Sequence, residues 1–213
     1  MEKLSDSRIS ECLETYGVLP TRLQCDQVRA YIALLLKWNR SISLTTVTEE
    51  AEVLKFHFGE SVLGLRAVSG IENGRLADVG AGAGFPGVPL RIFASHLQLV
   101  LIESNVKKCA FLSEVVRELG LENVRVIRGR FEHVSDFRND LDTIVARALG
   151  DYDELLKWAK NSLASTGKIA LWIGERDAGE IAKIESTWSW CAPVQILGSA
   201  KRVILSGSPK SRR

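Results

Sequence analysis

The sequence predicts an α/β protein with a mostly parallel, seven-stranded sheet that ends in an antiparallel hairpin and follows an N-terminal helical extension. Residues 1–70 show only the hydrophobic spacing of helices. After residue 70, short apolar runs alternate with amphipathic helices, which is typical of a doubly wound parallel sheet. We therefore divide the chain into an N-terminal helical subdomain, 1–70, and a second domain, 71–213.

The composition is that of an ordinary globular protein. The chain has 213 residues, of which 46% are hydrophobic and 25% charged, and these values exclude collagen and a mostly disordered chain. No apolar run approaches the roughly 18 residues of a membrane span, and the N-terminus has no apolar signal core. The four cysteines are too scattered to form a Cys-x-x-Cys metal site. We expect a cytoplasmic protein with no metal and no contact with a membrane.

Three helices are expected in the first part of the chain. Ser5 can cap the first helix, which should end near Gly17. Apolar residues between Val28 and Trp38 recur at helical spacing and predict the second helix. The third is expected over residues 49–68 for the same reason.

Seven strands and five further helices are expected after residue 70. The strands are 75–79, 97–103, 124–128, 143–146, 168–173, 193–197 and 202–205. The helices are 86–95, 105–119, 131–137, 152–163 and 178–186. Only residues 198–201 separate the last two strands, so these two should form an antiparallel hairpin.

A glycine-rich segment between the first strand and its helix points to a nucleoside ligand. Gly80, Gly82 and Gly84 allow close approach of the backbone, and the helix that follows offers unpaired N–H groups to an anion. A dinucleotide fingerprint fits the glycines only if it starts at Gly82. The alternative, an acidic-Gly-x-Gly-x-Gly loop that binds S-adenosylmethionine, starts directly after the strand with Asp78 as its acid. This second frame is favoured.

Glu103 is the second indication of a nucleoside. It ends the second predicted strand, where a carboxylate can accept hydrogen bonds from both ribose hydroxyls of an adenosine. This role fits NAD and S-adenosylmethionine equally well, so Glu103 does not separate the two cofactors.

Several motifs together resemble the glucose-inhibited division protein B family, the bacterial guanine-N7 methyltransferases of 16S ribosomal RNA. The most specific is the loop from Asp78 to Leu90, with its Gly-Phe-Pro-Gly extension. The others are Trp38-Asn39, Leu44-Thr45, His57 with Glu60-Ser61, Glu103-Ser104-Asn105 with Lys107-Lys108, Arg130-Phe131-Glu132 and Ala146-Arg147-Ala148.

The resemblance implies a class I, Rossmann-like methyltransferase fold and S-adenosylmethionine as cofactor. It implies cofactor contacts at Gly80, Phe85, Phe131, Glu132 and Arg147. Asp78, Gly82, Gly84 and Glu103 complete the expected cofactor site. The expected partner is 16S ribosomal RNA or the 30S subunit, and we expect a monomer.

The sequence departs from the family pattern at three positions. The family usually carries Asp at the place of Glu60, Asn at the place of Ser43 and Lys at the place of Ile173. Lys168 or Arg176 is a candidate to replace that lysine. His57 is interpreted as a helix-packing residue rather than a catalytic one.

The residues after the fourth strand favour N7 as the methyl acceptor. They read Val145-Ala146-Arg147-Ala148, without the polar-Pro-Pro-aromatic motif that methylation of an exocyclic amine usually needs. Guanine N7 has an in-plane lone pair and no proton to lose, so positioning alone can carry the reaction. Arg147 is the candidate for orienting the substrate, and no residue is expected to act as a base.

Basic residues supply the candidates for RNA binding. These are Arg128 and Arg130 near the strand ends, and Lys210, Arg212 and Arg213 in the C-terminal tail. The net charge of +2 permits an RNA substrate but does not require one. Two alternatives stay open: a class I methyltransferase acting on another substrate, and a nucleotide-binding module without catalysis.

Overall fold

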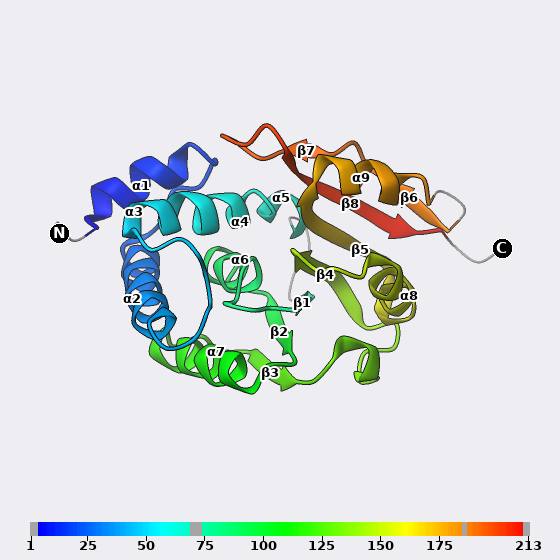
Figure 1. Cartoon of the computed structure of the whole chain (residues 1–213), viewed down its shortest axis with the longest axis horizontal. Coiled ribbons are helices and arrows are strands. Elements are labelled where there is room, and N and C mark those ends of the chain that lie inside the picture. Colours follow the sequence, from blue (N-terminus) through cyan, green and yellow to red (C-terminus); the bar gives the residue numbers. More distant parts are fainter. Residues whose placement is uncertain (1–3, 69–73, 185–186, 211–213) are drawn as a thin grey trace.

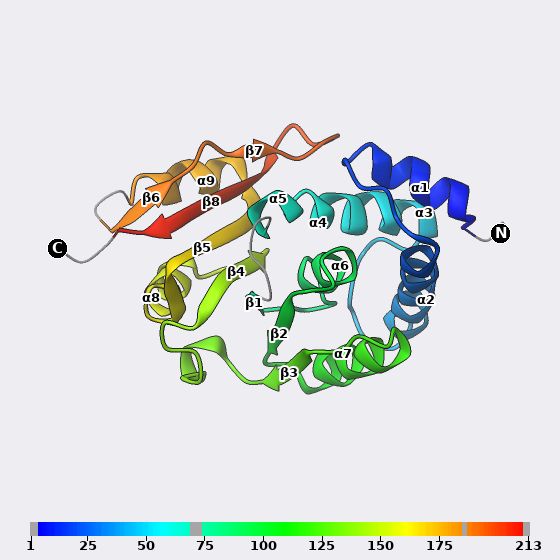
Figure 2. The same ribbon diagram turned by 180° about the vertical axis from the view of Figure 1, so that it is seen from behind.

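Eight strands form one mixed sheet in the computed structural model, which describes residues 4–68, 74–184 and 187–210. They are β1 (Arg75–Val79), β2 (Gln98–Glu103), β3 (Val124–Arg128), β4 (Leu141–Arg147), β5 (Leu163–Gly174), β6 (Trp188–Trp190), β7 (Val194–Gln195) and β8 (Arg202–Pro209). Their order is β3-β2-β1-β4-β5-β8-β6, and β7 also pairs with β8. Strands β1 to β5 are parallel, and β8 runs antiparallel to β5 (Figures 1 and 2).

The prediction of a mostly parallel sheet with a terminal antiparallel hairpin is confirmed, but the predicted number of strands is wrong. The hairpin is β7 with β8, which share only two residue pairs. The additional strand is β6, whose three residues pair with the far end of β8. Its short Trp-Ser-Trp run shows alternation over too few residues to predict a strand.

Four helices cover both faces of the sheet; the first three connect parallel strands and the fourth follows β5. They are α6 (Gly87–Phe93), α7 (Val106–Glu118), α8 (Tyr152–Ser162) and α9 (Glu175–Ala182). The helix predicted over residues 178–186 corresponds to α9, which begins three residues earlier and ends at Ala182. Residues 185 and 186 lie outside the described part of the chain. Asn105 caps α7 by accepting hydrogen bonds from the backbone N–H groups of Lys107 and Lys108.

The predicted helix over 131–137 is wrong. The segment forms only a short 3₁₀ turn, η2 (Phe131–His133), and then continues without regular structure. The Trp158 indole N–H donates to the Val134 carbonyl at 2.9 Å, and Phe137 is buried in the core. Contacts with α8 therefore replace the hydrogen bonds that a local helix would make.

Six helical elements make up the described N-terminal part. They are α1 (Asp6–Glu14), α2 (Arg22–Asn39), α3 (Glu50–Val53), the π-helical segment η1 (Leu54–Gly59), α4 (Glu60–Val62) and α5 (Leu65–Val68). Ser5 caps α1 as predicted. The single helix predicted over 49–68 is wrong, because a π-helical segment and a turn at Leu63-Gly64 interrupt it. A Cβ at Gly64 would lie 2.4 Å from the Trp172 ring, so the turn passes directly over β5.

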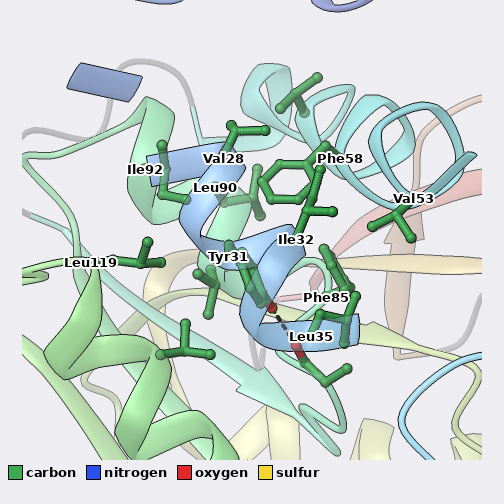
Figure 3. Packing of buried hydrophobic residues seen from close by; sticks show 14 of the residues in the cluster. Val28, Tyr31, Ile32, Leu35, Val53, Phe58, Phe85, Leu90, Ile92 and Leu119 are labelled. Atoms are coloured by element: carbon green, nitrogen blue, oxygen red, sulfur yellow. Dashed lines mark hydrogen bonds between the residues drawn. The ribbon is translucent and has the colours of Figure 1, made fainter. Parts of the chain in front are cut away.

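Two hydrophobic cores lie on opposite faces of the sheet. Alternate strand residues supply them: Leu76 belongs to one core and Ala77 to the other. The first core joins the N-terminal helices to α6 and α7 (Figure 3). The second core lies under α8 and α9 and contains Ile173. The N-terminal helices therefore share their core with the sheet, and the subdomain boundary near residue 70 remains our interpretation.

The length and the placement of the helices complete the description of the fold. Within the described ranges, no helix is long and apolar enough to cross a membrane. In both views of the whole chain, α1 to α7 gather on one side of the molecule and α8 and α9 on the other (Figures 1 and 2).

Candidate functional site

The glycine loop joins β1 to α6 and has a backbone that only glycine adopts easily. Gly80, Gly82 and Gly84 have φ angles of +68°, +57° and +88°. In this left-handed region a Cβ atom is strained, whereas glycine is not. The three glycines predicted for the cofactor loop are thus needed by its conformation.

Hydrogen bonds fix the loop to the end of β2. The N–H groups of Gly80 and Ala81 donate to the Ile102 carbonyl at 2.9 and 3.0 Å. The Gly82 N–H donates to Glu103 Oε2 at 2.9 Å. The two features that the sequence predicted separately, the glycine loop and Glu103, are therefore in direct contact.

The three glycines differ in what surrounds them. A Cβ at Gly84 would lie 2.5 Å from the Tyr31 hydroxyl oxygen, which donates a hydrogen bond to the Ala83 carbonyl (Figure 3). A Cβ at Gly82 would meet only the Gly80 carbonyl oxygen, at 3.7 Å. Gly84 therefore allows α2 to pack on the loop, while Gly82 faces open space that a ligand can enter.

Asp78 is buried and holds the loop together from inside. Its Oδ2 accepts a hydrogen bond from the Gly87 N–H at 2.8 Å, across the start of α6. A Cβ at Gly87 would lie 2.6 Å from that oxygen, so glycine is required there. Burial raises the pKa of Asp78 to about 7, although the Gly87 hydrogen bond opposes this shift. Its observed contacts are with the loop, and a direct cofactor contact remains a prediction.

Glu103 is also buried, but its carboxylate keeps acceptor capacity. Oε2 accepts from Gly82, and Oε1 accepts from the Asn105 N–H at 2.7 Å. An ionised carboxylate offers about four acceptor positions. The hydrogen bonds orient the group and leave lone pairs for ribose hydroxyls.

A pocket of about 280 Å³ opens between the glycine loop, the end of β2 and the turn after β3. Its lining residues are Gly80, Ile102, Ser104, Gly129, Arg130, Phe131, Glu132 and Leu149. Phe131 packs edge-on against Trp158, with ring centroids 5.9 Å apart. Glu132 pairs with Arg130 at 2.7 Å and has a second carboxylate oxygen that is buried without a partner among the described residues. Ligands of such sheets bind beyond the carboxyl ends of the strands, which is where this pocket lies.

Arg147 ends β4 at the same edge of the sheet. One of its nitrogens, Nη2, donates to Glu60 Oε2 at 3.1 Å and to the Phe56 carbonyl at 3.3 Å. The other, Nη1, is buried and has no hydrogen-bond partner in the described part of the chain. Burial lowers the pKa of the Arg147 guanidinium from its usual value, while Glu60 opposes that shift. The chain then turns through Ala148, which has a φ of +53°.

Phe85 and His57 lie in the core between the loop and the N-terminal helices. The Phe85 ring stacks on Tyr31 at 5.2 Å between centroids and lies 4.8 Å from the His57 ring. His57 Nε2 is 2.7 Å from the Thr45 hydroxyl oxygen. Burial and the nearby Arg147 guanidinium lower the pKa of His57 to about 4, so this histidine is neutral at pH 7. A cofactor contact of Phe85 remains a prediction.

The predicted RNA-binding residues do not gather at one place. Arg128 and Arg130 are exposed at the carboxyl edge of the sheet, next to the pocket. Lys210 follows β8, which runs antiparallel, so it lies at the opposite edge. Arg212 and Arg213 lie outside the described residues.

The structure places the two candidates for the missing family lysine at different edges of the sheet. The Ile173 side chain is buried in the second core. Lys168 pairs in register with Thr143, near the start of β4 and far from the carboxyl edge, so Lys168 as a replacement at this edge is wrong. Arg176 is exposed at the start of α9.

Sequence reasoning missed several contributors to the site, among them the pocket residues Ile102 and Ser104. Gly129 and Leu149 line the pocket, and each follows a strand end, so their position after β3 and β4 was a usable signal. Tyr31 supports the loop from α2, and Arg202 reaches Glu60 from β8. Only the folded chain brings these last two to the site. No group of His, Cys, Asp or Glu suited to a metal occurs among the residues that the structure describes.

Solved structures resemble this chain in fold. A SAM dependent methyltransferase from Aquifex aeolicus superposes with a TM-score of 0.61 and 19% identity, covering 73% of this chain and 92% of that one. A predicted O-methyltransferase from Agrobacterium tumefaciens has a TM-score of 0.61 and 17% identity, covering 72% and 82%. The chain therefore has the class I methyltransferase fold, as predicted.

Comparisons of sequence identify the family, whereas the solved structures show only the fold. The model of the family described as rRNA small subunit methyltransferase G matches residues 24–202. The ribosomal RNA small subunit methyltransferase G of Neisseria meningitidis serogroup A is 36% identical over 159 residues, which are 75% of this chain and 75% of that protein. The protein of the same name from a Thermoanaerobacter species is 34% identical, over 74% and 67% of the two chains. Because both the family model and these relatives cover most of its length, the chain belongs to the rRNA small subunit methyltransferase G family.

Proposed function

We propose that this protein transfers a methyl group from S-adenosylmethionine to N7 of a guanine in 16S ribosomal RNA. Family membership supports a ribosomal RNA methyltransferase that uses this cofactor. The observation that carries the proposal is the contact between Gly82 and Glu103 beside the pocket at the carboxyl edge.

The residues at this edge fit an adenosine with an attached amino acid. Glu103 can accept the ribose hydroxyls, and Phe131 and Glu132 can flank the adenine. The glycine loop provides close backbone approach next to the start of α6. A Glu132 carboxylate oxygen at the pocket and Arg147 Nη1 at the end of β4 are buried without a partner among the described residues and could each bond to a ligand.

The proposed chemistry needs orientation and no base. S-adenosylmethionine, when bound, supplies an electrophilic methyl group on a positively charged sulfur. Guanine N7 presents its lone pair without losing a proton. Arg147, at the end of β4, can hold the guanine or the cofactor in line for displacement. His57 is half-buried beside the Phe85 ring and takes no part in proton transfer in this proposal.

The RNA target has to be an accessible loop or bulge, because side chains cannot reach N7 in the narrow major groove of duplex RNA. Arg128 and Arg130 are exposed near the pocket, which supports a role for them in binding phosphates near the target. Lys210 would contact RNA further from the pocket, and Arg212 and Arg213 remain candidates for RNA binding. We further propose that the substrate is 16S RNA or the 30S subunit, that the enzyme acts as a monomer and that it works in the cytoplasm.

Methyl transfer to purified ribosomal substrates tests this function. Labelled S-adenosylmethionine is incubated with 30S subunits or naked 16S RNA from a strain lacking the gene, and the RNA is digested to nucleosides. We expect label in 7-methylguanosine, and no label after replacement of Glu103 by Ala at low cofactor concentration. Label in another nucleoside would contradict N7. Cofactor binding without transfer to either substrate would indicate a binding module.

A further inference from the structure

Glu60 is a buried carboxylate that is shared by two arginines. Its side chain is 1% exposed. Oε2 accepts hydrogen bonds from Arg147 Nη2 at 3.1 Å and from Arg202 Nη1 at 2.9 Å, and Oε1 accepts from Arg202 Nη2 at 2.5 Å. We call Glu60, Arg147 and Arg202 the Arg–Glu–Arg group.

The group joins three segments that are distant in sequence. Glu60 follows the π-helical segment η1, Arg147 ends β4 and Arg202 begins β8. The backbone of Glu60 is fixed as well, because its carbonyl accepts a hydrogen bond from the Trp172 indole N–H of β5 at 2.8 Å. The residue that carries the carboxylate is therefore anchored to the sheet through its backbone. It also follows a π-helical segment, and such segments often occur at functional sites.

The charges of the group do not balance. Two guanidiniums share one carboxylate, which leaves one positive charge uncompensated within the group. Arg202 donates to both carboxylate oxygens of Glu60. Arg147 donates to only one of them, and it does so through Nη2 alone. Its Nη1 stays buried and unpartnered among the described residues. A buried donor without an acceptor is costly, so a bound ligand is the natural partner.

We propose that Glu60 and Arg202 are positioning residues that hold Arg147 with Nη1 free to donate to the bound substrate or cofactor. The inference rests on the proposed methyl transfer. Arg202 pairs with the Glu60 carboxylate and fixes its orientation. Glu60 in turn restrains the Arg147 side chain, which is 17% exposed. The N-terminal helices and β8 thereby act on the reaction centre without touching it.

A purely structural role is the competing explanation, since the same ion pairs also tie the N-terminal helices to the sheet. The two roles differ in their coupling to Arg147. If Glu60 acts through Arg147, removing Glu60 costs nothing more once Arg147 is altered; if it only stabilises the fold, the two losses multiply.

A double-mutant cycle on the single-turnover rate separates these roles. The variants are Glu60→Gln, Arg147→Lys and their combination, measured with 30S subunits at saturating cofactor. Arg147→Lys keeps the charge but not the two-pronged geometry. We expect each single change to slow transfer about tenfold or more, as for loss of one charge-assisted hydrogen bond. The double variant should be within about twofold of the slower single variant.

Two further variants serve as controls. Glu60→Asp retains the carboxylate and should recover most of the rate that Glu60→Gln loses. Glu114→Gln makes the same chemical change at another contact between the N-terminal helices and the sheet side, the Trp38 indole to Glu114 at 3.0 Å. It should leave the rate unchanged.

Arg202→Gln gives a second route if Glu60→Gln does not fold. The Arg202 side chain is 41% exposed, so its loss is better tolerated. Its effect on the rate should also disappear in the Arg147→Lys background. Multiplying losses in both cycles, or a normal rate in folded Glu60→Gln, would overturn the proposal.

NMR of the arginine side chains adds a readout that does not depend on turnover. We expect restrained, slowly exchanging Arg147 Nη–H signals in the wild type and in Glu114→Gln, and averaged signals in Glu60→Gln. Unchanged Arg147 signals in Glu60→Gln would also overturn the positioning role. If the wild type methylates neither 30S subunits nor 16S RNA, the proposed function fails, whereas the NMR comparison still tests the Arg–Glu–Arg group.

Discussion

Among single residues at the carboxyl edge, Glu103 has both an observed contact and a proposed role. It orders the glycine loop through the Gly82 N–H, and we propose that it also accepts the ribose hydroxyls. The predicted mechanism needs no base, and His57, whose pKa is lowered in part by Arg147, packs against the Phe85 ring.

Replacing Glu103 by Ala should weaken cofactor binding and spare RNA binding. The change removes a charged acceptor worth about 1.5–3 kcal/mol per hydrogen bond, which corresponds to roughly a tenfold to hundredfold loss of affinity. Calorimetry with S-adenosylhomocysteine and a filter-binding assay with 16S RNA measure the two affinities. A matched control is Glu118→Ala, since Glu118 lies on the surface of α7. An equal loss of RNA affinity in Glu103→Ala would contradict the ribose role.

The single-turnover rate should be nearly flat around neutral pH. The folded pKa of His57, about 4, lies below the usual value of 6.5, so this group is already neutral throughout that range. Rapid-quench measurements at saturating cofactor and RNA from pH 6 to 8 test this. Asp78, with a pKa of about 7, titrates within this range, and saturation keeps any resulting change in cofactor affinity out of the rate. A tenfold rise per pH unit that disappears in His57→Gln would show a required base.

The same pKa gives His57 a defined effect on stability. Because folding lowers its pKa, the unfolded chain binds a proton that the folded chain does not between about pH 6.5 and 4. The free energy of unfolding contributed by His57 is therefore present above pH 6.5 and is lost as the pH falls. Urea unfolding of the wild type and of His57→Gln should converge toward pH 4. Asp78 acts in the opposite direction, so only the difference between the two proteins isolates His57.

At the scale of elements, the glycine loop separates into a packed part and an open part. Gly84 is covered by Tyr31 of α2, and Gly82 faces open space. The predicted helix over 131–137 shows the same dependence on neighbours, since contacts with α8 leave it as a short 3₁₀ turn.

Gly84→Ala and Gly82→Ala should differ in stability and in ligand binding. Both place Ala at positive φ, which costs about 1–2 kcal/mol. At Gly84 the added Cβ also collides with the Tyr31 hydroxyl, which adds about 1–3 kcal/mol of overpacking. Urea unfolding should therefore show the larger loss for Gly84→Ala. Calorimetry with S-adenosylhomocysteine should show that Gly82→Ala weakens binding beyond its effect on stability, and equal stability losses would contradict this division.

At the scale of the whole molecule, the N-terminal helices are part of the main core. Ile9 and Phe58 belong to the same hydrophobic cluster as Leu76 and Leu101 of the sheet. Glu60 and Arg202 add a polar connection between these helices and β8. The helical subdomain is thus expected to depend on the sheet for its stability.

We therefore expect α2 and β1 to unfold in one cooperative transition. A shared core exposes the same apolar surface whichever side opens, so neither part has an independent stable state. Native-state hydrogen exchange measures this directly. Buried amides of α2 and β1 should give the same free energy of opening. If α2 opened several kcal/mol more easily than β1, residues 1–70 would be a separate folding unit.

The sequence by itself determined the features that depend on a few neighbouring residues. Short apolar runs located β1 to β5, and the spacing of Gly80, Gly82 and Gly84 predicted a loop of close backbone approach before a helix. The motifs around this loop were enough to indicate the family. These signals are local because apolar runs and positive φ angles are properties of short segments.

Only the tertiary structure decided which distant residues meet. Glu60 contacts Arg147 and Arg202 across 87 and 142 positions of sequence, and the antiparallel course of β8 carries Lys210 to the edge opposite the site. Phe85 was expected at the cofactor and has its ring in the aromatic cluster with Tyr31, where its role as a ligand contact stays a prediction. The physical reason is that such contacts depend on the direction and order of strands across the whole sheet, and no local pattern of residues encodes that path.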